Sequence, residues 1–198
     1  MGRKVTITTP GTDPDGFFPK GPASVCIEGA PRQCYTMPED FGRNTSATVV
    51  NLAKDDPALL FSADGGGVSG WQTHFALLRP NPGDVLEDLF LPVISISNQN
   101  QYAFWADPAI SDARIFVTAE DVWGPDEPHY GEHRFIISVC VRTTPPSSLE
   151  GFYHLEDRYM TVRKYNLDPD VKDDILASEK PEILARLLRV KQANPGLR

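Results

Sequence analysis

The sequence has few cysteines and no long apolar run. It contains three cysteines in 198 residues, too few for a disulfide-dense scaffold and too irregularly spaced for a zinc site with four ligands. No stretch approaches the roughly 18 consecutive apolar residues that a membrane-spanning helix needs. We therefore expect a soluble globular protein with no zinc ribbon and no membrane insertion.

Positive charge is also scarce. There are 19 lysines and arginines against 27 aspartates and glutamates, which gives a net charge of -8. A protein that mainly neutralises the phosphates of nucleic acid or anionic lipid needs the opposite balance, so we expect no nucleic-acid partner. Residues 35–150 carry six basic against sixteen acidic groups, and this surplus either keeps the protein soluble or binds cations.

The three cysteines that are present fall into two settings. Cys26 and Cys34 flank the sequence IEGAPRQ, whose glycine and proline let the chain turn back on itself. This spacing predicts a Cys26–Cys34 disulfide, and with it an oxidising compartment, so we expect a secreted or periplasmic protein. Cys140 lies in the apolar run FIISVCV and is predicted to be a buried free thiol.

Turn-forming residues dominate the first part of the chain. The segment TPGTDPDGFFPKGP is dense in proline, glycine and aspartate, which interrupt regular backbone pairing. We therefore predict an amino-terminal arm over residues 1–22 and one β-rich domain over residues 23–198. Phe17 and Phe18 in the arm would then anchor it to the domain, or to a partner if the arm is free.

Short apolar or alternating runs fill most of the remaining chain. Their β-branched and aromatic residues and their glycine, proline, asparagine or aspartate boundaries favour strands. The predicted strands are residues 47–52, 58–63, 72–78, 89–97, 101–106, 113–119 and 133–142, and a hairpin over 151–167 turns at Glu156 and Asp157. From Pro181 the period changes to that of an amphipathic helix, with Ile183, Leu184, Leu187 and Leu188 on its apolar stripe. The sequence thus predicts a mainly β fold, a single antiparallel β-sandwich-like domain with a carboxy-terminal amphipathic helix.

The segment over residues 120–134 is rich in histidine and carboxylate side chains. His129 and His133 are four residues apart, but Pro125, Pro128 and Gly131 disfavour the helix that the common zinc motif requires. In a loop, the two imidazoles can still converge on one divalent metal ion with a carboxylate. The candidate metal ligands are His129, His133, Glu132 and Asp126. The alternative interpretation is a solvated acidic loop.

A second set of residues combines aromatic rings with side-chain amides. Sugars bind by stacking on planar rings, with hydrogen bonds at the ring edge. The candidate ligand-binding residues are Trp71, Asn98, Gln99, Asn100, Gln101, Tyr102 and Trp105. Core packing is an equally open role for Trp105, since it lies in an alternating strand. The glycine-rich tract over residues 63–70 matches neither a phosphate-binding loop nor a nucleophile elbow, and is predicted to be a flexible hairpin connection.

No motif in this sequence names a reaction. The leading hypothesis is an extracytoplasmic, non-enzymatic binding or structural module with a carbohydrate, cell-envelope or protein ligand and no cofactor. The alternative is a metal-dependent hydrolytic enzyme that uses a divalent metal at the 120–134 loop.

Overall fold

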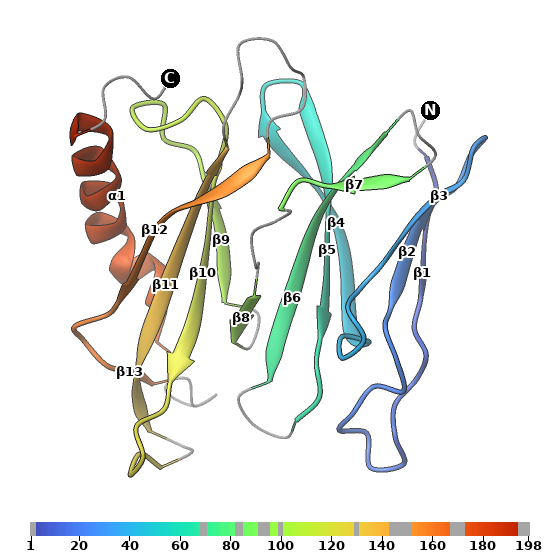
Figure 1. Cartoon of the computed structure of the whole chain (residues 1–198), viewed down its shortest axis with the longest axis horizontal. Coiled ribbons are helices and arrows are strands. Elements are labelled where there is room, and N and C mark those ends of the chain that lie inside the picture. Colours follow the sequence, from blue (N-terminus) through green and yellow to red (C-terminus); the bar gives the residue numbers. More distant parts are fainter. Residues whose placement is uncertain are drawn as a thin grey trace. The chain divides into compact units, whose positions relative to one another are not determined.

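The computed structural model of the chain describes residues 3–67, 71–81, 85–90, 96–98, 101–128, 131–142, 152–166 and 173–193. The chain divides into two compact units, Met1–Asn100 and Gln101–Arg198, and each has its own hydrophobic core. The described residues form three antiparallel sheets and one carboxy-terminal helix (Figure 1), which confirms the predicted fold class. A single domain over residues 23–198 stays a prediction. Within the described residues, no helix is long and apolar enough to cross a membrane.

The first unit begins with a small sheet that includes part of the predicted arm. Strand β1 (Val5–Thr8) pairs with β2 (Ser24–Ile27), and β2 pairs with β3 (Gln33–Thr36), all antiparallel. The turn-rich residues between β1 and β2 form no regular strand, as predicted. The amino-terminal segment is therefore tied to the unit through backbone pairing at its start.

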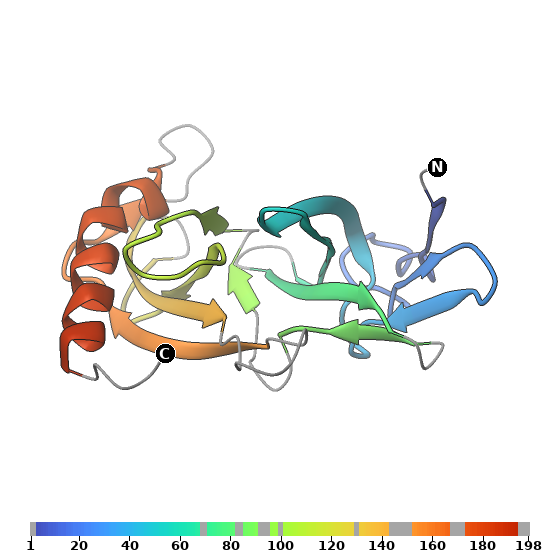
Figure 2. The same cartoon turned by 90° about the horizontal axis from the view of Figure 1, so that it is seen from above.

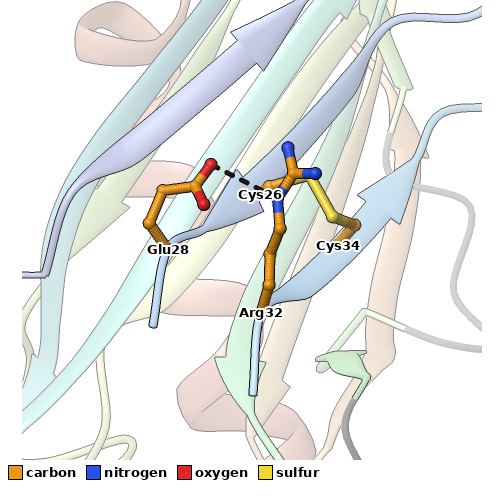
Figure 3. The surroundings of a disulfide bond; sticks show 4 residues. All are labelled: Cys26, Glu28, Arg32 and Cys34. Carbon is orange, nitrogen blue, oxygen red and sulfur yellow. Dashed lines mark ion pairs between the residues drawn. A yellow bond between two sulfur atoms is a disulfide. The ribbon is translucent and has the colours of Figure 1, made fainter. Parts of the chain in front are cut away.

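The predicted disulfide joins the two strands of a hairpin. Cys26 in β2 and Cys34 in β3 are direct cross-strand partners with their Cα atoms 4.1 Å apart, and their sulfur atoms are bonded. Beyond the disulfide, Arg32 and Glu28 form an exposed ion pair of 3.3 Å across the same hairpin (Figure 3). Cys140 is a buried free thiol, as expected, and burial raises its pKa to about 12. The bridge therefore closes the turn around residues 28–32.

A larger sheet packs against the small one to form the core of the first unit. Its strands are β4 (Arg43–Ala53), β5 (Asp56–Asp64), β6 (Gln72–Pro80), β7 (Leu86–Asp88) and β8 (Ile96–Asn98), in the order β4-β5-β6-β7 with β8 also on β6. The core includes Val25 and Met37 from the small sheet region and Phe61 and Leu78 from the larger sheet. This sheet-on-sheet burial of apolar faces is the packing of a β-sandwich. Of the predicted strand over residues 89–97, Leu89 and Phe90 form a turn, residues 91–95 lie outside the described residues, and Ile96 and Ser97 lie in β8.

The second unit is one sheet covered by a helix. Its strands are β9 (Tyr102–Trp105), β10 (Ile115–Val122), β11 (Glu132–Arg142), β12 (Tyr153–Met160) and β13 (Tyr165–Asn166), in the order β12-β11-β10-β9 with β13 also on β11. Figure 2 shows helix α1 (Ile175–Ala193) along one face of this sheet. Strand β11 is buried on both faces, since Phe135 and Val139 on one face and Cys140 on the other are each less than 5% exposed.

The predicted hairpin turn at Glu156 and Asp157 is wrong. Both residues lie inside β12, and the chain turns only after Met160. Each carboxylate has a partner that lets it remain in a strand: Glu156 pairs with His154 at 2.8 Å and Asp157 pairs with Arg186 of α1 at 2.6 Å. For Asp157, the ion pair with helix α1 therefore overrides the local turn preference.

Helix α1 begins six residues earlier than the sequence pattern predicted. Asp174 caps it, because its side-chain oxygen accepts the Ala177 backbone N–H at 3.0 Å. Pro181 consequently lies inside the helix and not at its first position. The face that packs on the sheet also differs from the predicted stripe, since Leu188 is 38% exposed. The buried helix residues are Ile175, Leu176, Ile183 and Leu187.

Polar contacts hold the helix in register on the sheet. The Glu179 carboxylate accepts hydrogen bonds from the Tyr159 hydroxyl at 2.9 Å and from the Tyr165 hydroxyl. Arg186 forms two hydrogen bonds with Asp157, and its guanidinium lies 4.4 Å from the centre of the Tyr159 ring. The helix is thus held on the sheet by its buried apolar residues and by the polar contacts of Glu179 and Arg186.

Replacing Leu187 with alanine should destabilise the protein much more than the same change at Leu188. Leu187 is 2% exposed, and removing a buried leucine side chain leaves a cavity and lowers the free energy of unfolding by about 2–5 kcal/mol. The matched control Leu188→Ala should stay within about 1 kcal/mol of the parent. Denaturant titrations followed by circular dichroism measure both. Equal losses in the two variants would contradict the observed helix face.

Candidate functional site

The tip of the amino-terminal arm is an ordered loop. The Asp13 side chain accepts the backbone N–H groups of Phe17 at 2.8 Å and Phe18 at 3.1 Å. The Asp13 N–H donates to the Phe18 carbonyl at 2.8 Å, and the Gly16 N–H donates to the Asp13 carbonyl at 3.1 Å. One aspartate therefore organises the loop that carries two consecutive phenylalanines.

Arg43, the first residue of β4, ties this loop to the larger sheet. Its Nη1 donates to the carbonyl oxygens of Phe17 at 2.8 Å and Gly16 at 3.1 Å, and its Nη2 donates to the Gly67 carbonyl at 3.3 Å. The Gly67 N–H adds a hydrogen bond to the Phe17 carbonyl at 3.1 Å. A planar guanidinium suits this task because its donors point in fixed directions. The arm and the β5–β6 connection are thus joined through one side chain.

The two phenylalanine rings remain exposed although their backbone is fixed. Phe17 is 40% exposed and Phe18 is 56% exposed. The Phe18 ring lies directly against Gly66, where an added Cβ would come within 2.2 Å of a ring carbon. Gly66 therefore makes room for an aromatic ring, and this gives the glycine-rich tract a packing role that the sequence pattern did not reveal.

Trp71 adds a third aromatic ring. It directly precedes β6 and is half-buried, and the Arg43 guanidinium lies 6.0 Å from the centre of its ring. The buried Nε1 of Trp71 and Nε of Arg43 have no hydrogen-bond partner among the described residues. Buried donors of this kind are rare in folded proteins. We call Phe17, Phe18, Arg43, Gly66 and Trp71 together the arm-tip site.

The strand ends beside this site carry further polar contacts. The Asp64 carboxylate accepts hydrogen bonds from Asn44 Nδ2 at 2.9 Å and from Thr73 Oγ1 at 2.6 Å. Burial lowers the pKa of His74 to about 4, so this imidazole is neutral at physiological pH. Its ring packs 5.1 Å from the ring of Phe41. Asp64 thus links β4, β5 and β6 next to the residues that position the arm tip.

The other predicted ligand-binding residues lie elsewhere in the chain. Asn98 ends β8 in the first unit, whereas Gln101, Tyr102 and Trp105 belong to the second unit. Gln99 and Asn100 lie outside the described residues. Tyr102 packs against Phe104 and Phe116 in aromatic contacts of 6.5 Å and 6.3 Å.

Trp105 has the packing role that the sequence left open. Its side chain lies against the core beneath α1, and the Lys180 ammonium is 5.1 Å from the centre of its ring. Of the predicted aromatic residues, Trp71 is therefore the one that the structure places among further aromatic and cationic side chains in the first unit.

The histidine-rich loop of the second unit contains an oriented imidazole. His133 at the start of β11 is 5% exposed, and its ring stacks on Trp123 with 4.8 Å between ring centres. Its Nδ1 lies 3.1 Å from Glu127 Oε2. The Trp123 indole N–H donates to Asp121 at 2.7 Å, and this hydrogen bond opposes the rise in the pKa of Asp121 that burial causes. The imidazole is therefore fixed in orientation by an aromatic ring and a carboxylate.

Glu127 is the central charge of this loop. Hydrogen bonds from Lys164 Nζ at 2.6 Å, from the Gly124 N–H at 3.0 Å and from His133 lower its pKa to about 2. An ionised carboxylate can only accept hydrogen bonds, so His133 carries a proton on Nδ1. In the neutral imidazole Nε2 then bears the lone pair, and this buried atom has no partner among the described residues.

Among the described residues, no contact joins one predicted metal ligand to another. His133 contacts Glu127, which sequence reasoning missed as a site residue, whereas Asp126 and Glu132 are exposed. The sequence feature that could have identified Glu127 is the turn that follows Gly124. In this turn the Glu127 N–H donates to the Gly124 carbonyl at 3.1 Å. His129 lies outside the described residues, and within those that are described no three metal-ligating side chains cluster.

Comparisons with known proteins give no functional information. A scan against models of protein families, a search of curated proteins and a search of solved structures each found no match to this chain. Function is therefore inferred from two clusters of side chains, the arm-tip site in the first unit and the His133–Glu127 pair in the second.

Proposed function

We propose that the protein is an extracytoplasmic, non-enzymatic binding module that takes a cell-envelope carbohydrate at the arm-tip site. The observation that carries this proposal is the exposure of Phe17 and Phe18 on a loop whose backbone is fixed. Exposed aromatic rings gain free energy by stacking on the apolar faces of sugar rings, as at other ligand sites with aromatic walls. A fixed loop lowers the conformational entropy lost on binding.

The surroundings of the rings support a polar, ring-shaped ligand. The carbonyl oxygens of Gly16 and Phe17 are already bound by Arg43, and the guanidinium has no carboxylate partner among the described residues. Sugar hydroxyl groups both donate and accept hydrogen bonds, so they suit a site where a guanidinium and backbone carbonyl oxygens lie beside aromatic rings. A carbohydrate chain fits this combination better than a purely apolar ligand does.

The disulfide supports a location outside the cytoplasm. Structural disulfides persist in secreted and periplasmic proteins and are rare in a reducing cytosol. The Cys26–Cys34 bridge joins two strands of the small sheet in the first unit. A location outside the cytoplasm would also give the module access to envelope polysaccharides.

Replacing both Phe17 and Phe18 with alanine should abolish most of the binding. Aromatic residues at the centre of a binding site contribute about 2 kcal/mol or more, so the affinity should fall by about thirtyfold or more. Co-sedimentation with insoluble peptidoglycan, chitin and cellulose identifies the polysaccharide that retains the parent protein. A titration with that polysaccharide then measures the affinity of the parent and of the variant. The control is Val85→Ala, which removes an equally exposed apolar side chain from the same unit. Equal loss in the control, or no retention of the parent on any polysaccharide, would contradict the proposal.

A metal-dependent hydrolytic enzyme is the second candidate, because Glu127 orients His133 as carboxylates orient metal-bound imidazoles. The binding-module proposal predicts no specific shift in melting temperature with zinc, nickel or calcium. A bound metal would instead stabilise the fold by about 2.7 kcal/mol at a hundredfold excess over its dissociation constant. A saturable rise lost in His129→Ala and His133→Ala, but kept in the half-exposed control His154→Ala, would favour the enzyme.

A further inference from the structure

Strand β4 of the first unit has a neighbour on one side only. It runs over eleven residues and pairs antiparallel with β5, and no other described strand pairs with it. The backbone groups on the outer side of an edge strand are a template for a further strand, and proteins usually protect such edges with charges, prolines or a covering segment. The presence or absence of such protection on β4 therefore indicates whether a further strand can pair with this edge.

This edge lacks the usual protection. Residues 44–53 contain neither a charged residue nor a proline, and four of the six residues from Ser46 to Asn51 are exposed. Two register irregularities flank this stretch, but from Ser46 to Asn51 the pairing with β5 is regular. The sequence SATVVN is also rich in residues that favour strands. Among the described residues of the first unit, a regular and uncharged edge of six residues is thus available for pairing.

Val49 is an exposed apolar side chain on the face of β4 where a partner strand would make apolar contacts. Its cross-strand neighbour Leu59 is 6% exposed, whereas Val49 itself is 67% exposed. Directly opposite residues in a sheet lie on the same face, so an apolar face that is buried at β5 is open to solvent at β4. A further strand beside β4 would cover the Val49 side chain.

We infer that β4 pairs with β4 of a second copy of this chain, antiparallel and about a two-fold axis at Val49. An antiparallel pairing with two-fold symmetry must set one residue opposite its own copy, because opposite residues share a face. With Val49 on the axis, Val49 faces Val49 and Thr48 faces Val50 of the other copy. Such pairs of β-branched residues are favourable across strands.

The charges at the strand ends favour the same arrangement. Arg43 precedes Val49 by six residues, and Asp55 follows it by six. The antiparallel pairing therefore keeps the two Arg43 ends apart, one at each end of the paired strands, whereas a parallel pairing would place Arg43 beside Arg43. Placing Thr48 on the axis would instead set Val49 opposite Ala47, with less apolar contact. A second copy therefore offers this edge a matching run of β-branched side chains without placing one Arg43 beside the other.

The oligomeric state of the full chain tests this inference. The parent should have twice the mass of one chain in sedimentation equilibrium, and Val49→Lys should return it to the mass of one chain, because two lysines would face each other. The control Val85→Lys adds the same charge at an exposed site of the same unit and should remain a dimer. A parent that is monomeric at all concentrations, or a Val49→Lys variant that stays dimeric, would overturn the inference.

Cysteine cross-linking tests the axis itself. Cys26 and Cys34 are bridged and Cys140 is buried, so a new cysteine at position 49 is the accessible thiol. Val49→Cys should form a covalent dimer on mild oxidation, because opposite residues bring their Cβ atoms within disulfide distance. Thr48→Cys is the control and should not, since it faces Val50 of the other copy. Cross-linking through position 48 alone would contradict a second copy paired at Val49. So would hydrogen exchange in which the β4 amides become protected only when a different protein is added.

Discussion

The guanidinium of Arg43 is the contact on which the arm-tip site depends. It binds three carbonyl oxygens from two segments that lie far apart in the sequence, the arm loop at Gly16 and Phe17 and the β5–β6 connection at Gly67. Hydrogen bonds from a charged donor contribute about 1.5–3 kcal/mol each, so they offset part of the conformational entropy that this turn-rich loop loses on folding. The exposed rings of Phe17 and Phe18 keep a fixed position because this contact holds their backbone.

Local pattern predicted most of the fold. Apolar periodicity found β10 and β11, the turn-forming spacer found the Cys26–Cys34 disulfide, and the carboxy-terminal helix was expected. The errors arose where a distant partner decides the local structure. Asp157 remains in a strand because Arg186 of the helix pairs with it, and the helix starts at Ile175 because Asp174 caps it.

The candidate sites were harder to predict, because they depend on contacts between segments far apart in the sequence. Trp71 is a candidate ligand-binding residue by its aromatic ring alone, and Phe17 and Phe18 are expected as anchors of the arm. Nothing local indicates that Arg43 joins the two, since the residues it contacts are more than twenty positions away. In the histidine-rich loop, Glu127 and not Asp126 contacts His133, because the turn after Gly124 directs Glu127 towards β11.

Limited proteolysis with chymotrypsin tests the central role of Arg43 most directly. The enzyme cleaves after aromatic residues, and the Phe17–Phe18 bond is the accessible target at the arm tip because Pro19 follows Phe18. Cleavage requires the loop to open. The account predicts that the parent and the control Arg32→Gln resist cleavage at this bond, while Arg43→Gln is cut there rapidly, as mass spectrometry of the fragments would show. Equal resistance of Arg43→Gln and the parent would contradict it.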